Sequence, residues 1–143
     1  MVIEDLIRDL AKVPGIVWVV GSGPVVSENS SNGMKAPEFA NGSVTIEADN
    51  WHFHLKLDRV DRVEFVEQDD PHDARLPAMY LVRFAGAQGD SPVRCYFPSP
   101  YRDDAGKISA LQPEKLKTFE ALRDAYAGRE GITFVQRVKT ASS

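Results

Sequence analysis

The sequence contains one cysteine, Cys95, among its 143 residues. A single thiol cannot form an internal disulfide, and it excludes a zinc site built from several cysteines. Cys95 stands in the alternating pattern Val93-x-Cys95-x-Phe97, where a free cysteine packs as a small hydrophobe. We therefore expect it to be an inert thiol in the core.

Positive charge and long apolar runs are also scarce. Lys and Arg number 17 against 21 Asp and Glu, which gives a formal net charge of −4. Because neutralisation of phosphates drives nucleic-acid binding, we expect no nucleic-acid partner. The apolar runs fall far short of the ~20 residues that a membrane helix needs, and the acidic start of the chain does not resemble a signal peptide. The sequence therefore predicts a cytoplasmic protein without a membrane partner.

Recognisable catalytic motifs are missing as well. There is no Gly-x-Ser-x-Gly nucleophile motif. The segment Gly21-Ser-Gly-Pro24 lacks the third glycine and the following helix of a dinucleotide-binding fingerprint. These absences favour a binding protein over an enzyme.

What the sequence does contain fits one domain. It is 43% hydrophobic and 27% charged, and a domain of this length buries roughly 68–70% of the surface that its unfolded chain exposes. Neither an internal repeat nor a linker divides it. We predict a single domain over residues 1–143, with 139–143 as a frayed tail.

Two segments, 2–12 and 113–126, carry apolar residues at the spacing of one helical face. These residues are Ile3, Leu6, Ile7 and Leu10 in the first segment, and Leu116, Phe119, Leu122 and Tyr126 in the second. Pro113 suits the first position of a helix, where its missing N–H does no harm. We expect a helix near each end of the chain.

Between these two helices, apolar residues recur at every second position, which is typical of strands. Apolar residues at 16–20 predict a strand buried on both faces, and a short strand is expected around 25–26. Alternation continues from 43 to 97, and 132–135 predict a last strand. Sequential strands joined by short turns predict an antiparallel sheet and an α+β fold. The polar stretch 27–41 is either a lid or ligand-contacting loop, or a plain mobile insertion.

The segment from Trp51 to Leu57 is the strongest candidate for a binding site. Alternate side chains of a strand share a face. We therefore expect the apolar residues of this strand to point into the core, and His52, His54 and Lys56 to stand together on the opposite face. Such a face is either a ligand floor or a solvated surface that happens to carry histidines.

A metal is one possible ligand. His52-x-His54 can supply two imidazoles to zinc or to non-haem iron, as in a metal-binding β-protein or a metal-dependent enzyme. The residues able to complete such a site are Glu64, Glu67 and His72. None of them lies at a diagnostic spacing.

Haem is the other possible ligand. Neutral imidazole is a common ligand of haem iron, but two neighbours on one strand approach from the same side, so at most one of His52 and His54 can bind a given iron. Lys56, Arg83 or Arg94 can pair with the propionates, because cations match carboxylates.

Several stretches resemble the small haem-utilisation proteins of the HutX/ChuX type, which are similar to one half of the larger HemS-type haem carriers. They are a Val17-Trp-Val-Val strand, Trp51-His-Phe-His-Leu followed by Val63-Glu-Phe-Val-Glu, and Arg94-Cys-Tyr-Phe-Pro before a helix that begins Gln112-Pro-Glu-Lys-Leu. The resemblance covers most of residues 1–137. This chain is shorter than the usual member, and its 27–41 stretch is its own.

The resemblance implies a saddle-like antiparallel sheet of about seven to nine strands between flanking helices. It also implies a homodimer and the binding or intracellular trafficking of haem for iron utilisation, with His52, His54 and Arg94 as the positions carried over. Our hypothesis is therefore a haem-binding protein. The alternatives are a metal-binding protein that uses His52-x-His54, and a ligand-free structural or regulatory dimer.

Overall fold

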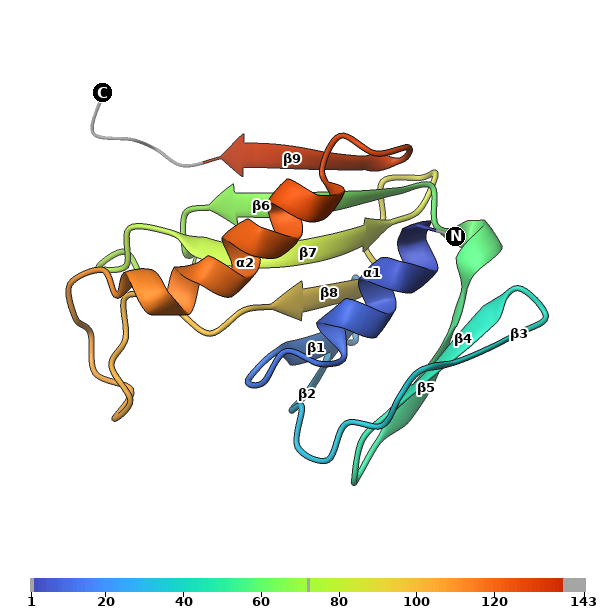
Figure 1. Ribbon diagram of the computed structural model, residues 1–143, viewed down its shortest axis with the longest axis horizontal. Helices are drawn as coiled ribbons and strands as arrows, with labels where there is room; N and C mark the ends of the chain where they lie inside the picture. Colours follow the sequence, from blue (N-terminus) through green and yellow to red (C-terminus); the bar gives the residue numbers. More distant parts are fainter. Residues whose placement is uncertain (1, 72, 138–143) are drawn as a thin grey trace.

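The computed structural model describes residues 2–71 and 73–137 of the chain. Two helices cover one face of a six-stranded sheet, and a separate three-stranded sheet lies beside it (Figure 1). The order in the larger sheet is β2-β1-β8-β7-β6-β9. Its strands are β1 (Val17–Val20), β2 (Ser27–Asn29), β6 (Arg62–Gln68), β7 (Met79–Ala85), β8 (Val93–Tyr96) and β9 (Ile132–Arg137).

The two helices are α1 (Val2–Leu10) and α2 (Pro113–Tyr126). They bury the apolar faces that the periodicity predicts, with Leu6, Leu10 and Phe119 at most 1% exposed. Trp18, Phe65 and other inward residues of the large sheet complete this core. The α+β class is thereby confirmed.

The smaller sheet has the order β3-β4-β5 and is antiparallel. Its strands are β3 (Glu38–Ala40), β4 (Ser43–Glu47) and β5 (His52–Lys56), and a short 3-10 turn (Leu57–Arg59) leads from β5 into β6. Val44, Ile46 and Leu55 point inward and join the same core. The small sheet therefore presents only its other face to solvent.

The observed strands depart from the sequence predictions in three places. The strand expected around 25–26 lies at 27–29, because Gly21 and Gly23 hold positive φ angles that prolong the turn. The stretch 27–41, which was expected to be a loop, contains two short strands, β2 and β3. Finally, β9 pairs with β6 in parallel, because α2 carries the chain across the sheet to its far edge. The tail predicted at 139–143 lies outside the described residues.

Cys95 is fully buried in the core, as its pattern predicts. Burial raises the pKa of its thiol well above the ordinary value, and a protonated thiol is a poor nucleophile. The prediction of an inert core cysteine is confirmed. Within residues 2–71 and 73–137, neither helix is long and apolar enough to cross a bilayer.

Candidate functional site

The two histidines of β5 lie where the alternation predicts them. His52, His54 and Lys56 are exposed on the outer face of the small sheet, while Leu55 is buried. The imidazole centroids of His52 and His54 are 5.5 Å apart. These three side chains therefore form one exposed group.

The surroundings of this group are polar. Thr45, on the neighbouring strand β4, places its Oγ1 2.9 Å from Nδ1 of His54. Glu47 and Ser43 stand opposite His52 and Lys56 in the same register. A polar face of this kind leaves little apolar surface against which a porphyrin plate could pack.

Arg83 and Arg94 lie on the large sheet, directly opposite each other on β7 and β8. They point away from the helices, into the face that we call the open face, because the neighbouring residues Val82 and Cys95 point into the core. Like charges directly opposite one another on a sheet repel. The pair therefore needs compensating negative charge.

Only Arg83 has that compensation. Its Nε donates a hydrogen bond of 2.9 Å to Oε1 of Glu64, and its Nη2 contacts the same oxygen. Arg62 binds the other oxygen of Glu64, at 3.3 Å. Burial would raise the pKa of Glu64, but hydrogen bonds from Arg83 and Arg62 outweigh it and hold the pKa below the ordinary value. One buried carboxylate therefore serves two guanidinium groups.

Arg94 has no carboxylate partner among the described residues. Its Nη2 donates to the backbone carbonyl of Gly21 at 3.0 Å. Its Nε is buried and has no hydrogen-bond partner within residues 2–71 and 73–137. A buried guanidinium nitrogen without an acceptor is costly, so Arg94 is prepared to receive an anion.

Arg94 lines a cavity of about 750 Å³ on the open face. The floor comes from β1 and β7, which contribute the apolar side chains Val17, Val19 and Met79. The remaining lining residues are Val26, Glu28, Asp70, Pro71, Tyr96 and Arg102. The volume lies within the range of roughly 300–1,000 Å³ that is typical of small-molecule sites. We call this the open-face cavity.

The structure does not bring the β5 histidines to this cavity. His52 borders a different cavity of about 350 Å³, which β1 lines through Val20. Val19 lines the open-face cavity, and successive residues of a strand point to opposite faces. The two cavities therefore lie on opposite sides of β1, and the predicted site residues divide into a histidine group and an arginine group.

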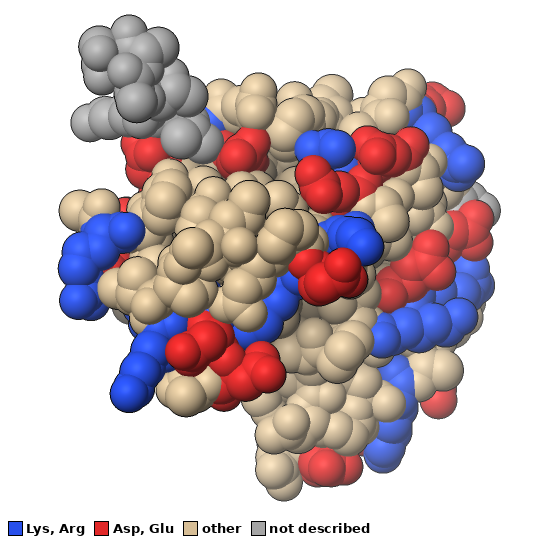
Figure 2. Space-filling view, turned by 60° about the vertical axis from the view of Figure 1, so that its left-hand side comes forward, with Lys and Arg blue, Asp and Glu red and all other residues tan. Residues whose placement is uncertain are grey.

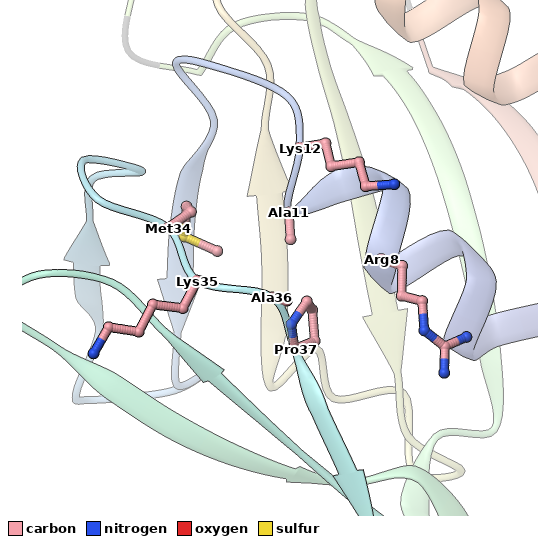
Figure 3. Close-up of a pocket in the computed structure, with 7 residues that line it drawn as sticks. All are labelled: Arg8, Ala11, Lys12, Met34, Lys35, Ala36 and Pro37. Atoms are coloured by element: carbon pink, nitrogen blue, oxygen red, sulfur yellow. The ribbon is translucent and has the colours of Figure 1, made fainter.

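A further cavity of about 350 Å³ lies between α1 and the segment before β3 (Figure 3). Ala11, Met34 and Pro37 give it apolar walls. Its cations point in different directions (Figure 3). Arg8 pairs with Asp5 at 3.1 Å and Lys35 pairs with Glu47 at 3.2 Å, so two of the three cations that line this cavity, Arg8 and Lys35 but not Lys12, have a carboxylate partner.

The metal hypothesis gains no third ligand from the part of the chain that is described. No group of three or more His, Cys, Asp or Glu side chains that could hold a metal ion occurs there. Glu64 is engaged by Arg83 and Arg62, and Glu67 accepts a hydrogen bond of 3.1 Å from Tyr80. His72 lies outside the described residues.

Charges of both signs are mixed on the surface in Figure 2, where small groups of basic and acidic side chains surround uncharged areas. An extended basic surface of the kind that binds nucleic acid is not seen on this face of the described structure. This agrees with the net charge of −4.

Comparison with known proteins shows the family. One protein-family model matches residues 4–126 of this chain. A structure of the haem-binding protein ChuX superimposes with a TM-score of 0.64 at 13% identity, over 85% of this chain and 70% of that one. The chain belongs to the ChuX/HutX-like family.

Two other solved proteins share this fold. A protein from Agrobacterium tumefaciens has a TM-score of 0.62 at 22% identity, over 87% of this chain and 64% of that one. A protein from Erwinia carotovora has a TM-score of 0.59 at 14% identity, over 87% and 69%. This member of the ChuX/HutX-like family thus spans about two thirds of their length. No curated protein matches the sequence.

Sequence reasoning missed most of the open-face cavity of this ChuX/HutX-like chain. It identified Arg94 as a possible propionate partner, but it did not identify Val19 or Met79 as lining residues. The usable signal was the polar half of the alternation in 93–97, where Arg94 and Tyr96 share one face of a strand. That signal becomes informative only when the neighbouring strands are known.

Proposed function

We propose that this protein binds haem, for intracellular haem trafficking or iron utilisation, and that the open-face cavity is the binding site. The observation that carries the proposal is Arg94, a guanidinium at the wall of a cavity of about 750 Å³ that has no carboxylate partner in the described part of the chain. The similarity to the haem-binding protein ChuX supports the choice of ligand.

The lining suits an apolar plate that carries carboxylates. Val17, Val19 and Met79 would pack against the porphyrin, since such contacts bury the apolar surface of the ligand. Arg94 would hold a propionate, because a guanidinium presents two parallel N–H donors to a carboxylate. Arg102 lines the same cavity but already pairs with Asp73 at 3.3 Å, so Arg94 is the principal anion contact.

A hemin titration tests the proposal. Purified protein should give a saturable Soret band, and Arg94→Met should weaken hemin binding about tenfold or more, because a charge-assisted hydrogen bond is lost. Arg59→Met, which changes an exposed arginine outside this cavity, is the matched control and should leave the affinity unchanged. Absence of a saturable band would remove the haem proposal.

The β5 histidines give a competing proposal for the same ligand. One of them would be the axial ligand of a haem that lies on the small sheet, with Lys56 beside a propionate. In that arrangement His52→Ala or His54→Ala would abolish the Soret shift and Arg94→Met would not. The same titration therefore decides between the two sites.

A second candidate function is binding of a divalent metal by His52 and His54. The specific observation is that both imidazoles are exposed on one face with centroids 5.5 Å apart. Zinc or iron accepts two such ligands and completes its shell with water or a carboxylate. We expect zinc binding measured by calorimetry to be lost in His54→Ala and kept in Lys56→Ala. Equal binding by both variants would contradict this site.

We also propose that the protein forms a homodimer, as the resemblance implies. Val25 and Val26 are 74% and 50% exposed, and Val26 borders the open-face cavity. Exposed apolar surface of this kind is typical of contact regions. A sedimentation measurement that gives the mass of one chain would contradict the dimer.

A further inference from the structure

We propose that the cavity between α1 and the segment before β3 binds a small organic anion with an apolar body. We call it the helix-side cavity. Leu6 of α1 packs in the core with Trp18, whereas the next residue of β1, Val19, lines the open-face cavity. The two cavities therefore lie on opposite sides of the large sheet. The helix-side cavity measures about 350 Å³, which suits a single ring system, since small-molecule sites measure roughly 300–1,000 Å³.

The charge of the lining selects an anion. Arg8, Lys12 and Lys35 line the cavity, and no carboxylate is among the described residues that do so. This lining contrasts with the formal net charge of −4 for the whole chain. Asp9, the acidic residue nearest to Lys12 in the sequence, is turned toward α2, where it accepts a hydrogen bond of 2.5 Å from the hydroxyl of Tyr126. A lining that is basic or uncharged attracts anionic ligands.

Lys12 is the principal anion contact. Arg8 has a carboxylate partner and its guanidinium lies 4.5 Å from the centroid of the Phe39 ring. Lys35 also has a carboxylate partner and extends away from the helix (Figure 3). Lys12 has no carboxylate partner within residues 2–71 and 73–137. It follows Arg8 by about one helical turn, and like charges at this spacing repel, so an anion beside Lys12 relieves this repulsion.

The apolar walls are in place without a ligand. Ala11 forms one wall, and Met34 and Pro37 form the other. Met34 packs partly against the core. The backbone N–H of Lys35 donates to the carbonyl of Glu47 on β4 at 2.9 Å, and β3, which begins directly after Pro37, pairs with the same strand. Preformed walls lower the entropic cost of binding.

Two fluorescent probes that differ in one group test the proposal: anilinonaphthalene sulfonate and its uncharged parent, phenylnaphthylamine. Both contain the same rings, and both gain fluorescence in an apolar site. We expect the sulfonate to bind at least about fivefold more tightly at low salt, which is the effect of one partly exposed ion pair. This difference should vanish in about 1 M salt, where the screening length falls to about 3 Å.

Variants locate the bound probe. Lys12→Met should weaken binding of the sulfonate about fivefold and that of the uncharged probe less than about twofold. Ala36 is exposed and lines the cavity. Ala36→Glu should weaken binding of the sulfonate about tenfold or more, because its carboxylate competes for the cations, whereas Ala36→Gln should change it less than about threefold. Lys107→Met changes an exposed lysine outside this cavity and should leave both affinities unchanged.

Three results would overturn the proposal. The first is equal affinity for the two probes at low salt, and the second is equal binding of the sulfonate by Ala36→Glu and Ala36→Gln. The third is binding of the sulfonate that Arg94→Met weakens and Lys12→Met does not, because the probe then occupies the open-face cavity. The hemin titration does not affect this test, since the described linings of the two cavities share no residue.

Discussion

Replacing Phe119 with alanine should lower the free energy of unfolding by about 4 kcal/mol. The side chain is 1% exposed, and removal of a buried phenylalanine costs roughly 3–5 kcal/mol. The ring of Phe119 in α2 contacts three aromatic rings, with centroids 5.1 Å from Tyr80 of β7, 5.8 Å from Phe65 of β6 and 5.3 Å from Phe97, which directly follows β8. Each such pair adds to the loss.

Urea denaturation followed by tryptophan fluorescence would measure this change. Phe134→Ala is the matched control, because it removes the same ring from a site that is 36% exposed, and it should cost under about 1.5 kcal/mol. Equal losses for the two variants would contradict the placement of α2 against the large sheet. Total stabilities of about 5–15 kcal/mol are normal for a domain, so Phe119→Ala removes a large share.

Glu64→Gln should lower the free energy of unfolding by about 3 kcal/mol at neutral pH. Glu64 is 6% exposed and holds the guanidinium groups of Arg83 and Arg62. Loss of one partner of a buried pair leaves the other charge uncompensated, which costs roughly 3–5 kcal/mol. We expect a cost at the lower end of this range, because the side chain of Arg83 is 19% exposed and solvent partly screens its charge.

The pH dependence gives this prediction a second readout. The pKa of Glu64 is lower in the folded protein than its ordinary value, since the two arginines outweigh the effect of burial. The carboxylate therefore stabilises the fold above the pKa of the unfolded chain, about 4.3, and this stabilisation is lost as the pH falls through the folded pKa. The difference between wild type and Glu64→Gln should shrink below about pH 4.

Two controls accompany Glu64→Gln. Glu28→Gln changes an exposed carboxylate on the same face of the sheet and should cost under about 0.5 kcal/mol. The double variant Glu64→Leu/Arg83→Met removes both charges and should recover much of the loss, because a buried pair can often be replaced by apolar side chains. A double variant as unstable as Glu64→Gln would count against the pairing as the cause.

These energies also bear on the proposed site. Arg83 and Arg94 lie opposite each other, but the structure gives a buried carboxylate only to Arg83. The compensation of one arginine leaves the other available to a ligand. Stability and the proposed ligand binding therefore involve neighbouring residues of the same face.

The sequence by itself determined the local features of this protein. The apolar stripes of α1 and α2 and the alternation in 51–57 are properties of neighbouring residues, since period and side-chain direction follow from backbone geometry. The exposure of His52, His54 and Lys56 could be predicted for that reason, and the structure places them as expected. The burial of Cys95 followed from the same argument.

Only the tertiary structure decided which strands are neighbours and what lies on the open face. The cavity joins Val17, Met79 and Arg102, which are far apart in the sequence. The parallel pairing of β9 with β6 depends on the path of α2 across the sheet, which periodicity does not specify. Strand order and register arise from the simultaneous burial of many distant side chains. For that reason, the ion pair between Glu64 and Arg83 and the position of Arg94 at a cavity appear only in the folded chain.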